Sequence, residues 1–309
     1  MNAWWLRFED GKAKLERREA PRPEPKPGEL LVKVRASSLN RGEFLGRYGV
    51  SAEAKPAGGE AAGEVVGSGR RVMGRARGAF AEYALMDERE AIPLPDSMSW
   101  EEGAAVPLVF LVTYDMLVTH GQLKRDEWLL VTGVSSGVGV ACLQAGKLIG
   151  AKVAGTSGST GKMDRMKGLG LDLPLGRSGF VDPLLKATGG KGVNLVVNNV
   201  GGTAFADCIR ALAYQGRLAI VGYVDGVLKA EVDLDAVHSK RLRIFGVSNK
   251  LRTAAERAET VAGFKRDWLP AFADGRLKPV IDRKFPLDEL PAALAYMESN
   301  AQLGKITVS

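Results

Sequence analysis

The sequence has few of the residues that build metal sites and disulfide frameworks, with two cysteines and two histidines among 309 residues. Cys142 and Cys208 lie 66 positions apart in apolar surroundings and form no CxxC pair, which favours buried thiols in a reducing compartment. His120 and His238 are equally scattered, so no spacing matches a catalytic or structural zinc site. A disulfide-stapled fold is therefore excluded, and we expect no bound metal.

Long apolar segments are also lacking. The longest uninterrupted apolar run, residues 104–112, is nine residues long and contains Pro107, whereas a membrane-spanning helix needs about 20 residues. The N-terminus carries Arg7, Glu9 and Asp10 where a secretory leader would have its apolar stretch. We therefore expect no transmembrane helix, no leader peptide and a cytoplasmic location.

Positive charge is in small excess. The sequence has 43 Lys and Arg and 36 Asp and Glu, which gives a net charge of +7. The basic residues are scattered in short groups such as Arg70-Arg71, and no aromatic-rich RNA-binding segment accompanies them. We expect a solvated basic surface with a local anion site and no nucleic-acid partner. The length and the 45% of apolar residues are enough for the cores of two domains, which excludes a disordered chain.

The pattern of the chain changes near its first third. Residues 1 to about 100 contain short β-rich runs separated by Gly and Pro, as in a small barrel or sandwich. From Trp128 onward, short apolar runs alternate with helical segments, which predicts a parallel, doubly wound sheet. The predicted strands are 128–132, 152–156, 193–198, 217–221 and 242–247, and the predicted helices 138–149, 162–169, 182–188 and 205–212. After residue 252 we expect a helix through Phe272 and strands at 280–285 and 305–308.

The sharpest local signal is the strand 128–132, which runs into the loop Gly133-Val-Ser-Ser-Gly137-Val-Gly139 and then an amphipathic helix. A tight turn before a helix N-terminus gathers free N–H groups and the positive end of the helix dipole, which attract phosphate. The strict G-x-G-x-x-G spacing is not met, because Val134 and Ser136 occupy its first two glycine positions.

The same loop permits two other interpretations. Gly133-x-Ser135-x-Gly137 matches the nucleophile elbow of serine hydrolases, and His238 with Asp225 or Asp233 follows in an acceptable chain order. No HGGG-type oxyanion segment accompanies it. The loop is also compatible with a structural turn that binds nothing.

The next predicted strand favours the nucleotide interpretation. A dinucleotide with a free ribose 2′-hydroxyl calls for Asp or Glu at the end of this strand, whereas a 2′-phosphate calls for small polar and cationic groups. The strand ends in Ser157-Gly-Ser-Thr-Gly-Lys162, which contains no carboxylate. Hydroxyl groups and an ammonium would bind a phosphate that a carboxylate would repel. NADPH is therefore favoured over NADH.

Short motifs occur along nearly the whole chain in the order and spacing of one known family. They are Asn40-Arg-Gly-Glu43-x3-Arg47-x-Gly49, Gly59-Glu60-x-Ala62-Gly63-x-Val65, Gly78-Ala-Phe-Ala-Glu-Tyr83, Ala104-Ala-Val-Pro107-x5-Thr113, Gly137-Val-Gly139, Gly189-Gly-Lys-Gly192 and Gly304-Lys305. In these the chain resembles the zinc-free quinone reductases of the medium-chain dehydrogenase/reductase superfamily, the zeta-crystallin-like group. The resemblance implies an α/β fold with a Rossmann sheet in residues 104–252. It also implies a β-rich, GroES-like, partly closed barrel domain built from residues 1–103 and 253–309.

The resemblance also implies a set of site residues. Asn40 and Thr113 would lie beside the nicotinamide, and Ser135, Ser136, Gly137 and Val138 would face the pyrophosphate. Ser157, Ser159, Lys162 and Arg177 would bind the 2′-phosphate. Asn199, Val200, Gly222, Tyr223, Phe245 and Gly246 would line the nicotinamide side, and Lys305 with Gly304 would close the cleft between the domains.

The sequence departs from the family at three points, one of which is the hairpin of residues 68–71, which is shorter than in the family. Ser136 replaces a glycine, which adds a hydroxyl donor. Zinc-dependent relatives have His where Gly59 stands. The tyrosine that some relatives place just after the Gly49 position is Ser51 here, while Tyr48 is close by but offset. Asn40 and Tyr48 are therefore the candidates for the hydrogen bond to the reacting substrate.

The activity that the resemblance implies is transfer of hydride from NADPH to a quinone or another activated C=C bond, such as an enone or an enoyl thioester, without zinc. Three alternatives stay open: a carbonyl reductase acting on aldehydes or ketones, a hydrolase using Ser135, and a nucleotide-binding protein without catalysis. Family members usually form homodimers by pairing the edge strand of the nucleotide sheet, here residues 242–247.

Overall fold

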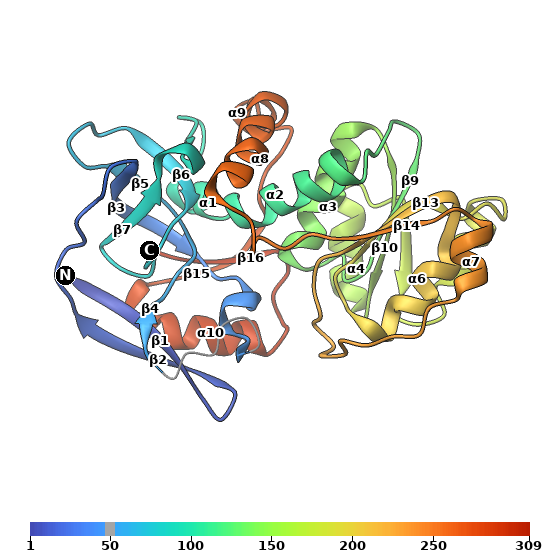
Figure 1. Ribbon diagram of the computed structural model, residues 1–309, viewed down its shortest axis with the longest axis horizontal. Coiled ribbons are helices and arrows are strands. Elements are labelled where there is room, and N and C mark those ends of the chain that lie inside the picture. Colours follow the sequence, from blue (N-terminus) through green and yellow to red (C-terminus); the bar gives the residue numbers. More distant parts are fainter. Residues whose placement is uncertain (47–52) are drawn as a thin grey trace. The chain divides into compact units, whose positions relative to one another are not determined.

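The computed structural model describes residues 1–46 and 53–309, which form two compact units (Figure 1). The first unit contains Met1–Leu111 and Thr253–Ser309, and the second unit contains Val112–Arg252. The chain thus leaves the first unit, builds the whole of the second and then returns to complete the first. Each unit has its own sheet system.

The second unit is built on a six-stranded sheet in the order β11-β10-β9-β12-β13-β14, with all neighbouring strands parallel. Its strands are β9 (Trp128–Val131), β10 (Lys152–Ser157), β11 (Leu173–Gly176), β12 (Val193–Asn198), β13 (Leu212–Ile220) and β14 (Arg243–Gly246). Its connecting helices are α3 (Gly137–Ile149), α4 (Thr160–Gly168), α5 (Val181–Ala187), α6 (Phe205–Ala211) and α7 (Leu234–Ser239). The order reverses between β9 and β12, which is the switch point of a doubly wound fold.

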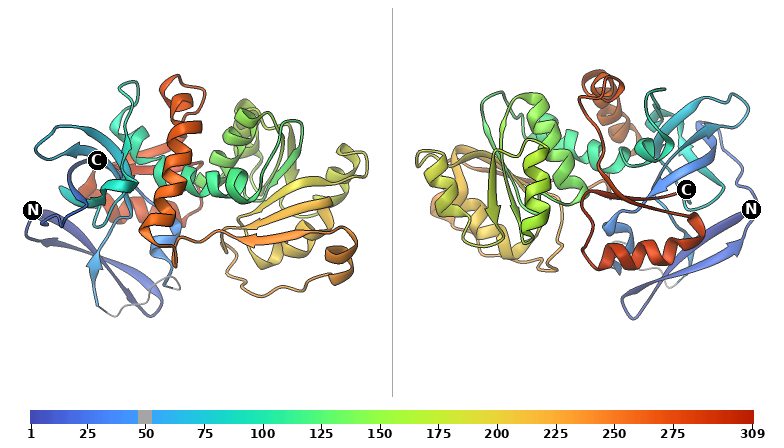
Figure 2. Two further views of the ribbon diagram at one scale, coloured as in Figure 1. Left: turned by 45° about the horizontal axis from the view of Figure 1, so that its top comes forward. Right: turned by 180° about the vertical axis from the view of Figure 1, so that it is seen from behind.

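Helices cover both faces of this sheet (Figure 2). Successive side chains of a strand point to opposite faces. Leu129 and Val153 therefore lie against Gly146 of α3, while Leu130 and Ala154 belong to the buried cluster that includes residues of α5 and α6. The central strand β9 is apolar throughout and β12 is mostly apolar, because both faces of the sheet are buried at these strands.

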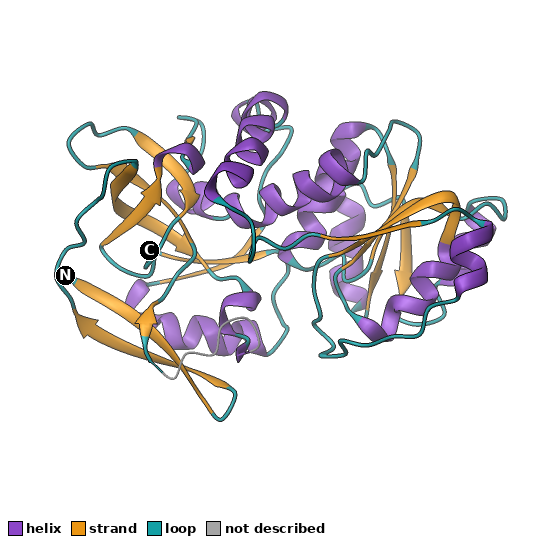
Figure 3. Ribbon diagram, in the orientation of Figure 1, coloured by secondary structure: helices purple, strands orange, loops and turns teal. Residues whose placement is uncertain are grey.

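The first unit contains two sheets together with several helices (Figure 3). A seven-stranded sheet runs in the order β15-β16-β3-β5-β6-β8 with β7 beside β3, and a smaller sheet runs β2-β1-β4. These strands are β1 (Asn2–Glu9), β2 (Lys12–Glu19), β3 (Glu29–Ser38), β4 (Lys55–Pro56), β5 (Glu60–Val65), β6 (Arg71–Arg75), β7 (Tyr83–Asp87), β8 (Ile92–Pro93), β15 (Ile281–Phe285) and β16 (Lys305–Val308). Since β16 pairs with β3, the last residues of the chain complete a sheet begun by the first.

Short helices complete the first unit. They are α1 (Trp100–Ala104), α8 (Ala254–Asp267), α9 (Leu269–Ala273), α10 (Leu290–Glu298) and the 3-10 turns η1 (Arg41–Phe44), η3 (Glu88–Glu90) and η6 (Leu287–Glu289). The helix α2 (Pro107–Tyr114) and the π-helical turn η4 (Asp115–His120) follow α1 in the chain, and the boundary between the units falls within α2. No helix among the described residues has the length and apolarity to cross a membrane.

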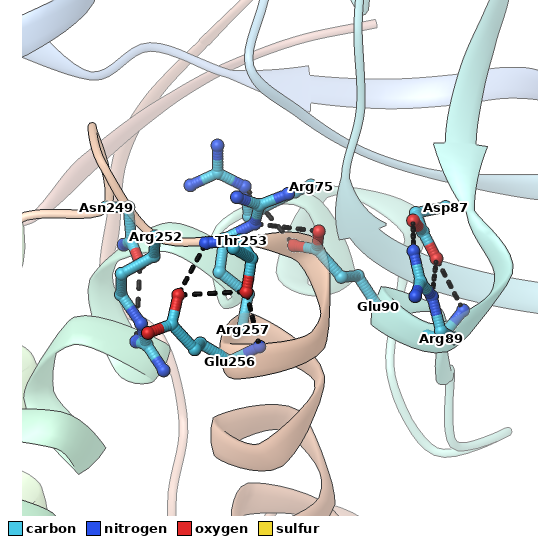
Figure 4. A network of polar contacts seen from close by, with 9 residues as sticks. All are labelled: Arg75, Asp87, Arg89, Glu90, Asn249, Arg252, Thr253, Glu256 and Arg257. Atoms are coloured by element: carbon cyan, nitrogen blue, oxygen red, sulfur yellow. Dashed lines mark hydrogen bonds and ion pairs between the residues drawn. The ribbon is translucent and has the colours of Figure 1, made fainter.

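Ionic contacts hold α8 to the rest of the first unit (Figure 4). The buried carboxylate of Glu90 accepts a hydrogen bond from Nε of Arg257 at 2.8 Å and lies 3.4 Å from Nε of Arg75. At the start of α8, the Thr253 hydroxyl accepts from the Glu256 N–H, and the Glu256 carboxylate accepts from the Thr253 N–H. This capping box marks the residue at which the chain re-enters the first unit.

The predicted fold class, a doubly wound parallel sheet with a β-rich second part, is confirmed. The predicted single helix through Phe272 is wrong, because it is divided at Trp268 into α8 and α9. Pro270 lies in the first turn of α9, and a proline cannot continue a helix that already runs before it. The hairpin of β1 and β2 was not predicted, because its outer strand is almost entirely polar and charged.

Candidate functional site

The turn between β9 and α3 has the geometry of an anion site. Ser136 caps α3, its hydroxyl accepting from the Gly139 N–H at 3.0 Å. A Cβ on Gly139 would lie 2.5 Å from the carbonyl oxygens of Gly133 and Val134, so the helix can approach the turn this closely only with glycine there. Ser135, Ser136, Gly137 and Val138, all predicted at the pyrophosphate, are partly exposed at this helix N-terminus. Free N–H groups at such a terminus bind phosphate oxygens.

Polar side chains lock the switch point between β9 and β12. The Thr132 hydroxyl donates to Oδ1 of Asn198 at 3.2 Å and accepts from the Asn199 N–H at 2.9 Å. Nδ2 of Asn199 donates to the Ser136 hydroxyl at 2.5 Å, and a Cβ on Gly222 would lie 3.1 Å from Oδ1 of Asn199. Asn199 thus joins the loop after β12 to the turn after β9 and lies beside Gly222 in the loop after β13.

The second turn of the sheet, from β10 to α4, collects the residues predicted for a 2′-phosphate. Ser159 caps α4, its hydroxyl accepting from the Lys162 N–H at 3.4 Å. The backbone N–H of Ser159 donates to the Ser157 hydroxyl at 3.2 Å. Arg177, after β11, is exposed and its Cδ would lie 3.8 Å from a Cβ on Gly158. The β10–α4 turn therefore contains the two predicted hydroxyl groups and the Lys162 ammonium, and the segment after β11 adds the guanidinium of Arg177. Residues 157–162 contain no carboxylate.

The other predicted residues of the second unit lie at several depths. Thr113 is fully buried in α2, with its hydroxyl 3.6 Å from Sγ of Cys142, and burial raises the pKa of that thiol to about 12 although the Thr113 contact opposes the rise. Val200 and Tyr223 are partly exposed in loops, and Gly246 is exposed on β14. The ring of Phe245 lies 5.6 Å from that of His120.

A buried ionic cluster occupies the first unit at the point where β3, β5, β16 and α2 meet. Glu60 is fully buried and its Oε1 accepts from Ser38 at 2.5 Å, Asn40 at 2.6 Å and Lys305 at 2.9 Å. Its Oε2 accepts from the Leu108 N–H at the start of α2, at 2.7 Å. A buried carboxylate tolerates this position because these four donors, one of them a cation, surround it.

Lys305 and Asn40 share this cluster. The Lys305 ammonium is buried, and its three N–H groups donate to Glu60, to Oδ1 of Asn40 at 2.7 Å and to the Leu39 carbonyl at 2.9 Å. Asn40 itself is partly buried at the start of η1. The structure thus places two of the predicted site residues in direct contact.

Glu43 is a member of the cluster that the sequence-based prediction missed. Its Oε1 accepts from Nδ2 of Asn40 at 3.1 Å. Burial raises the pKa of Glu43 to about 7; the Asn40 hydrogen bond opposes the rise, the Glu60 carboxylate adds to it, and the charges of Lys305 and Arg75 oppose it. The signal available was the pair of carboxylates in the motifs around Asn40 and Gly59, both set among small and apolar residues.

The remaining sequence-based candidates gain no support as functional groups. Tyr48 lies outside the described residues. Of the acids proposed for a hydrolase, Asp233 caps α7 and Asp225 accepts from Thr203 and from the Val227 N–H. Burial alone would raise the pKa of Asp225, but these donors hold it below its usual range. Both acids therefore have structural partners.

The described residues do not form a donor set for zinc. Within residues 1–46 and 53–309, no group of three or more His, Cys, Asp and Glu side chains is placed to hold a metal. A Cβ on Gly59 would lie 3.0 Å from Oε1 of Glu43. A histidine at this position would need space that the Glu43 carboxylate occupies, so we derive no chemistry from a metal.

A doubly wound sheet with an anion-binding turn at its first strand, followed by a β10–α4 turn lined with hydroxyl and cationic groups, defines a dinucleotide-binding protein. Comparisons with known proteins agree. Residues 169–308 match a family described as zinc-binding dehydrogenases. The quinone oxidoreductase of Thermus thermophilus, solved with NADPH, is 28% identical with a TM-score of 0.87 over 100% of this chain and 99% of that one. The chain is thus similar to zinc-binding dehydrogenases over residues 169–308 and to this quinone oxidoreductase over its whole length.

Two further proteins are similar to the chain. A protein described as an NAD-dependent alcohol dehydrogenase is 27% identical with a TM-score of 0.86, covering 100% of this chain and 99% of that one. The spectinabilin polyketide synthase system protein NorB of Streptomyces orinoci is 31% identical over 92% of this chain. The chain spans 13% of NorB, so the resemblance concerns one segment of a much longer protein.

Proposed function

We propose that this protein is an NADPH-dependent oxidoreductase that reduces a quinone or another activated C=C bond, an enone or an enoyl group, without zinc. The observation that carries the proposal is the β10–α4 turn. Ser157, Ser159, Lys162 and Arg177 offer hydroxyl and cationic groups where an NADH-specific site would have a carboxylate. The complex of the Thermus relative with NADPH supports the choice of cofactor.

The residues of the second unit would hold the cofactor and the first unit would act on the substrate. The N-terminus of α3, capped by Ser136, would bind the pyrophosphate, and Asn199 would fix that cap. When bound, NADPH supplies a hydride. We propose that Asn40 contributes a hydrogen bond to the oxygen on which negative charge develops, which is the kind of preorganised contact that lowers the barrier to such a reduction.

The test is a turnover assay of the purified protein with NADPH or NADH and three acceptor panels: quinones, α,β-unsaturated carbonyl compounds, and simple aldehydes. We expect NADPH absorbance to fall with the first two panels and to fall more slowly when NADH replaces NADPH. Preference for aldehydes would make the protein a carbonyl reductase. NADPH binding without turnover on any panel would contradict the enzymatic assignment.

The hydrolase alternative has a separate test. Ser135 should stay unlabelled by a fluorophosphonate reagent, because Asp225 and Asp233 have other partners and no activating triad is formed with His238, which is exposed on α7. Mass-spectrometric detection of the adduct on Ser135 would revive that interpretation.

A further inference from the structure

The hydrogen bonds of Asn40 leave it no donor for a substrate. An asparagine amide has two N–H groups and one carbonyl oxygen. One N–H goes to Glu60 at 2.6 Å and the other to Glu43 at 3.1 Å, while the oxygen accepts from Lys305 at 2.7 Å. In this arrangement the amide orientation is fixed, because the two carboxylates require N–H groups and the ammonium requires the oxygen. Any contact of Asn40 with a substrate oxygen needs one of these bonds to be released.

The two carboxylates hold Asn40 with different strength. Glu60 is fully buried, paired with Lys305, and accepts four hydrogen bonds. Within the part of the chain that is described, Glu43 accepts one side-chain hydrogen bond, the longer of the two from Asn40, and its side chain is partly exposed. A short bond supported by a buried ion pair is costly to break, whereas a longer bond to a carboxylate that no cation of residues 1–46 and 53–309 contacts is less costly. The hydrogen bond between Asn40 and Glu43 is therefore the one that a substrate oxygen can replace at the lower cost.

We propose that Glu43 is a positioning residue that, as a carboxylate, holds the second N–H of Asn40 and, once protonated, releases it to a substrate oxygen. The inference rests on the proposed function, because it assigns the released N–H to the oxygen of the quinone or enone. A neutral carboxyl group is a weaker acceptor than a carboxylate, so proton uptake shifts the competition for this N–H toward the substrate. Glu43 itself need not touch the substrate.

The surroundings of Glu43 make this proton uptake accessible near neutral pH. Among the residues that the structure describes, the charged groups that act on Glu43 are Glu60 of β5, Lys305 of β16 and Arg75 of β6. Burial raises the pKa of Glu43 to about 7, with Glu60 adding to the rise and the two cations opposing it. Because the pKa of Glu43 is raised, its neutral form is the more populated one below a pH of about 7. Above that pH, the carboxylate is the more populated form. The proposal therefore makes the acidic side of this range the active one.

The first experiment is the pH profile of kcat at saturating NADPH and acceptor. The wild-type kcat is expected to fall about tenfold between about pH 6 and about pH 8, as required if one group must be protonated. Glu43→Gln mimics the neutral acid and should keep a flat profile at the acidic wild-type level. The matched control is Glu64→Gln on β5, which removes an exposed ion pair with Arg35 and should retain the wild-type profile.

Two results would overturn the proposal: a Glu43→Gln profile with the same inflection as the wild type, or a kcat that rises through neutral pH. A structural role for Glu43 would lower kcat equally at every pH and leave the inflection in place. If Glu43→Gln does not fold, Glu43→Ala removes the same acceptor and should likewise abolish the inflection.

The second experiment does not depend on turnover. In protein labelled with ¹⁵N, the side-chain NH₂ signals of Asn40, identified by their loss in Asn40→Ala, should shift with a midpoint near pH 7 in the wild type. They should stay in place over this range in Glu43→Gln. Asn40 signals that titrate identically in both proteins would overturn the inference. Titrating Asn40 signals together with no turnover on any acceptor would contradict the proposed function and leave the Glu43 contact established.

Discussion

At the scale of single residues, the first unit shows how partners decide what a carboxylate can do. Glu60 and Glu43 both contact Asn40, but among the described residues only Glu60 has an ammonium in contact with it. The Lys305 ammonium in contact with Glu60 fixes that carboxylate in place, whereas burial raises the pKa of Glu43 to about 7, so that Glu43 takes up a proton near neutrality. The side-chain amide of Asn40 thus contacts both Glu60, which has a structural role, and Glu43, which titrates.

Removing the charge of Glu60 should destabilise the protein strongly. Glu60→Gln leaves the buried Lys305 ammonium without its counter-ion, and loss of one partner of a buried pair costs about 3 to 5 kcal/mol. Urea unfolding followed by tryptophan fluorescence would measure the change. The control is Glu64→Gln, whose exposed pair with Arg35 is worth about 0 to 1 kcal/mol. Equal losses in the two variants would mean that the buried pair adds no net stability.

Removing both cations of the β10–α4 turn should change cofactor preference. Lys162→Ala combined with Arg177→Ala is expected to weaken NADPH binding by about tenfold or more, because charge-assisted hydrogen bonds are worth about 1.5 to 3 kcal/mol. NADH binding should change little, since NADH lacks the extra phosphate. Isothermal titration calorimetry with both dinucleotides measures this.

The matched control for that double variant is Lys167→Ala, which removes a charge from the same helix at its other end, where Lys167 pairs with Asp164. It should leave the preference for NADPH intact. Similar losses of NADPH and NADH affinity in the double variant would contradict the assignment of a phosphate site to this turn.

Site residues that are neighbours in one short segment of the chain could be predicted from the sequence. Site residues that only tertiary contacts bring together could not. Ser157, Ser159 and Lys162 are neighbours in the chain, so their chemistry is visible in one short segment. Glu60 and Lys305 are 245 positions apart, and they meet in one cluster because both β5 and β16 pair with β3. That the predicted residues contact cofactor and substrate stays a prediction.

At the scale of elements, the close packing of α3 on its preceding turn depends on Gly139. Gly139→Ala would place a methyl group 2.5 Å from two backbone carbonyl oxygens, and such overpacking costs about 1 to 3 kcal/mol. The shift of α3 should also weaken NADPH binding. Thermal unfolding and calorimetric titration measure the two effects.

The matched substitution is Gly161→Ala in the first turn of α4, where no atom lies within 4 Å of the added Cβ. It should leave stability unchanged or raise it by up to about 1 kcal/mol, because alanine restricts the unfolded chain and favours the helix. A Gly139→Ala variant as stable as Gly161→Ala would mean that the turn relaxes without cost.

Elements with a strong periodic pattern were predictable, and those set by neighbours were not. The strand 193–198 and the strand 305–308 lie where the apolar pattern placed them. The strand β13 begins at Leu212, earlier than the predicted residue 217, because its first residues are partly polar and its pairing with β12 contains an irregularity. Such pairing is decided by the neighbouring strand rather than by local composition.

At the scale of the whole molecule, we expect a homodimer formed through β14. This strand is the edge of the six-stranded sheet, and Ile244, an apolar side chain on it, is 38% exposed. An exposed apolar edge is a template for pairing with a second copy. Multi-angle light scattering should give twice the chain mass, and Ile244→Lys should shift the population to monomer. A wild-type monomer at micromolar concentration would contradict this expectation.

The β16–β3 pairing also bears on how the polypeptide matures on the ribosome. Residues 112–252 emerge as one contiguous segment and contain every strand of their sheet. Strand β3 is synthesised early, yet its neighbour β16 leaves the exit tunnel much later. Until then Glu60 has no Lys305 ammonium to contact. All strands of the six-stranded sheet are therefore synthesised before β16, and a premature stop codon ahead of β16 would leave that sheet with every strand and take one strand from the seven-stranded sheet.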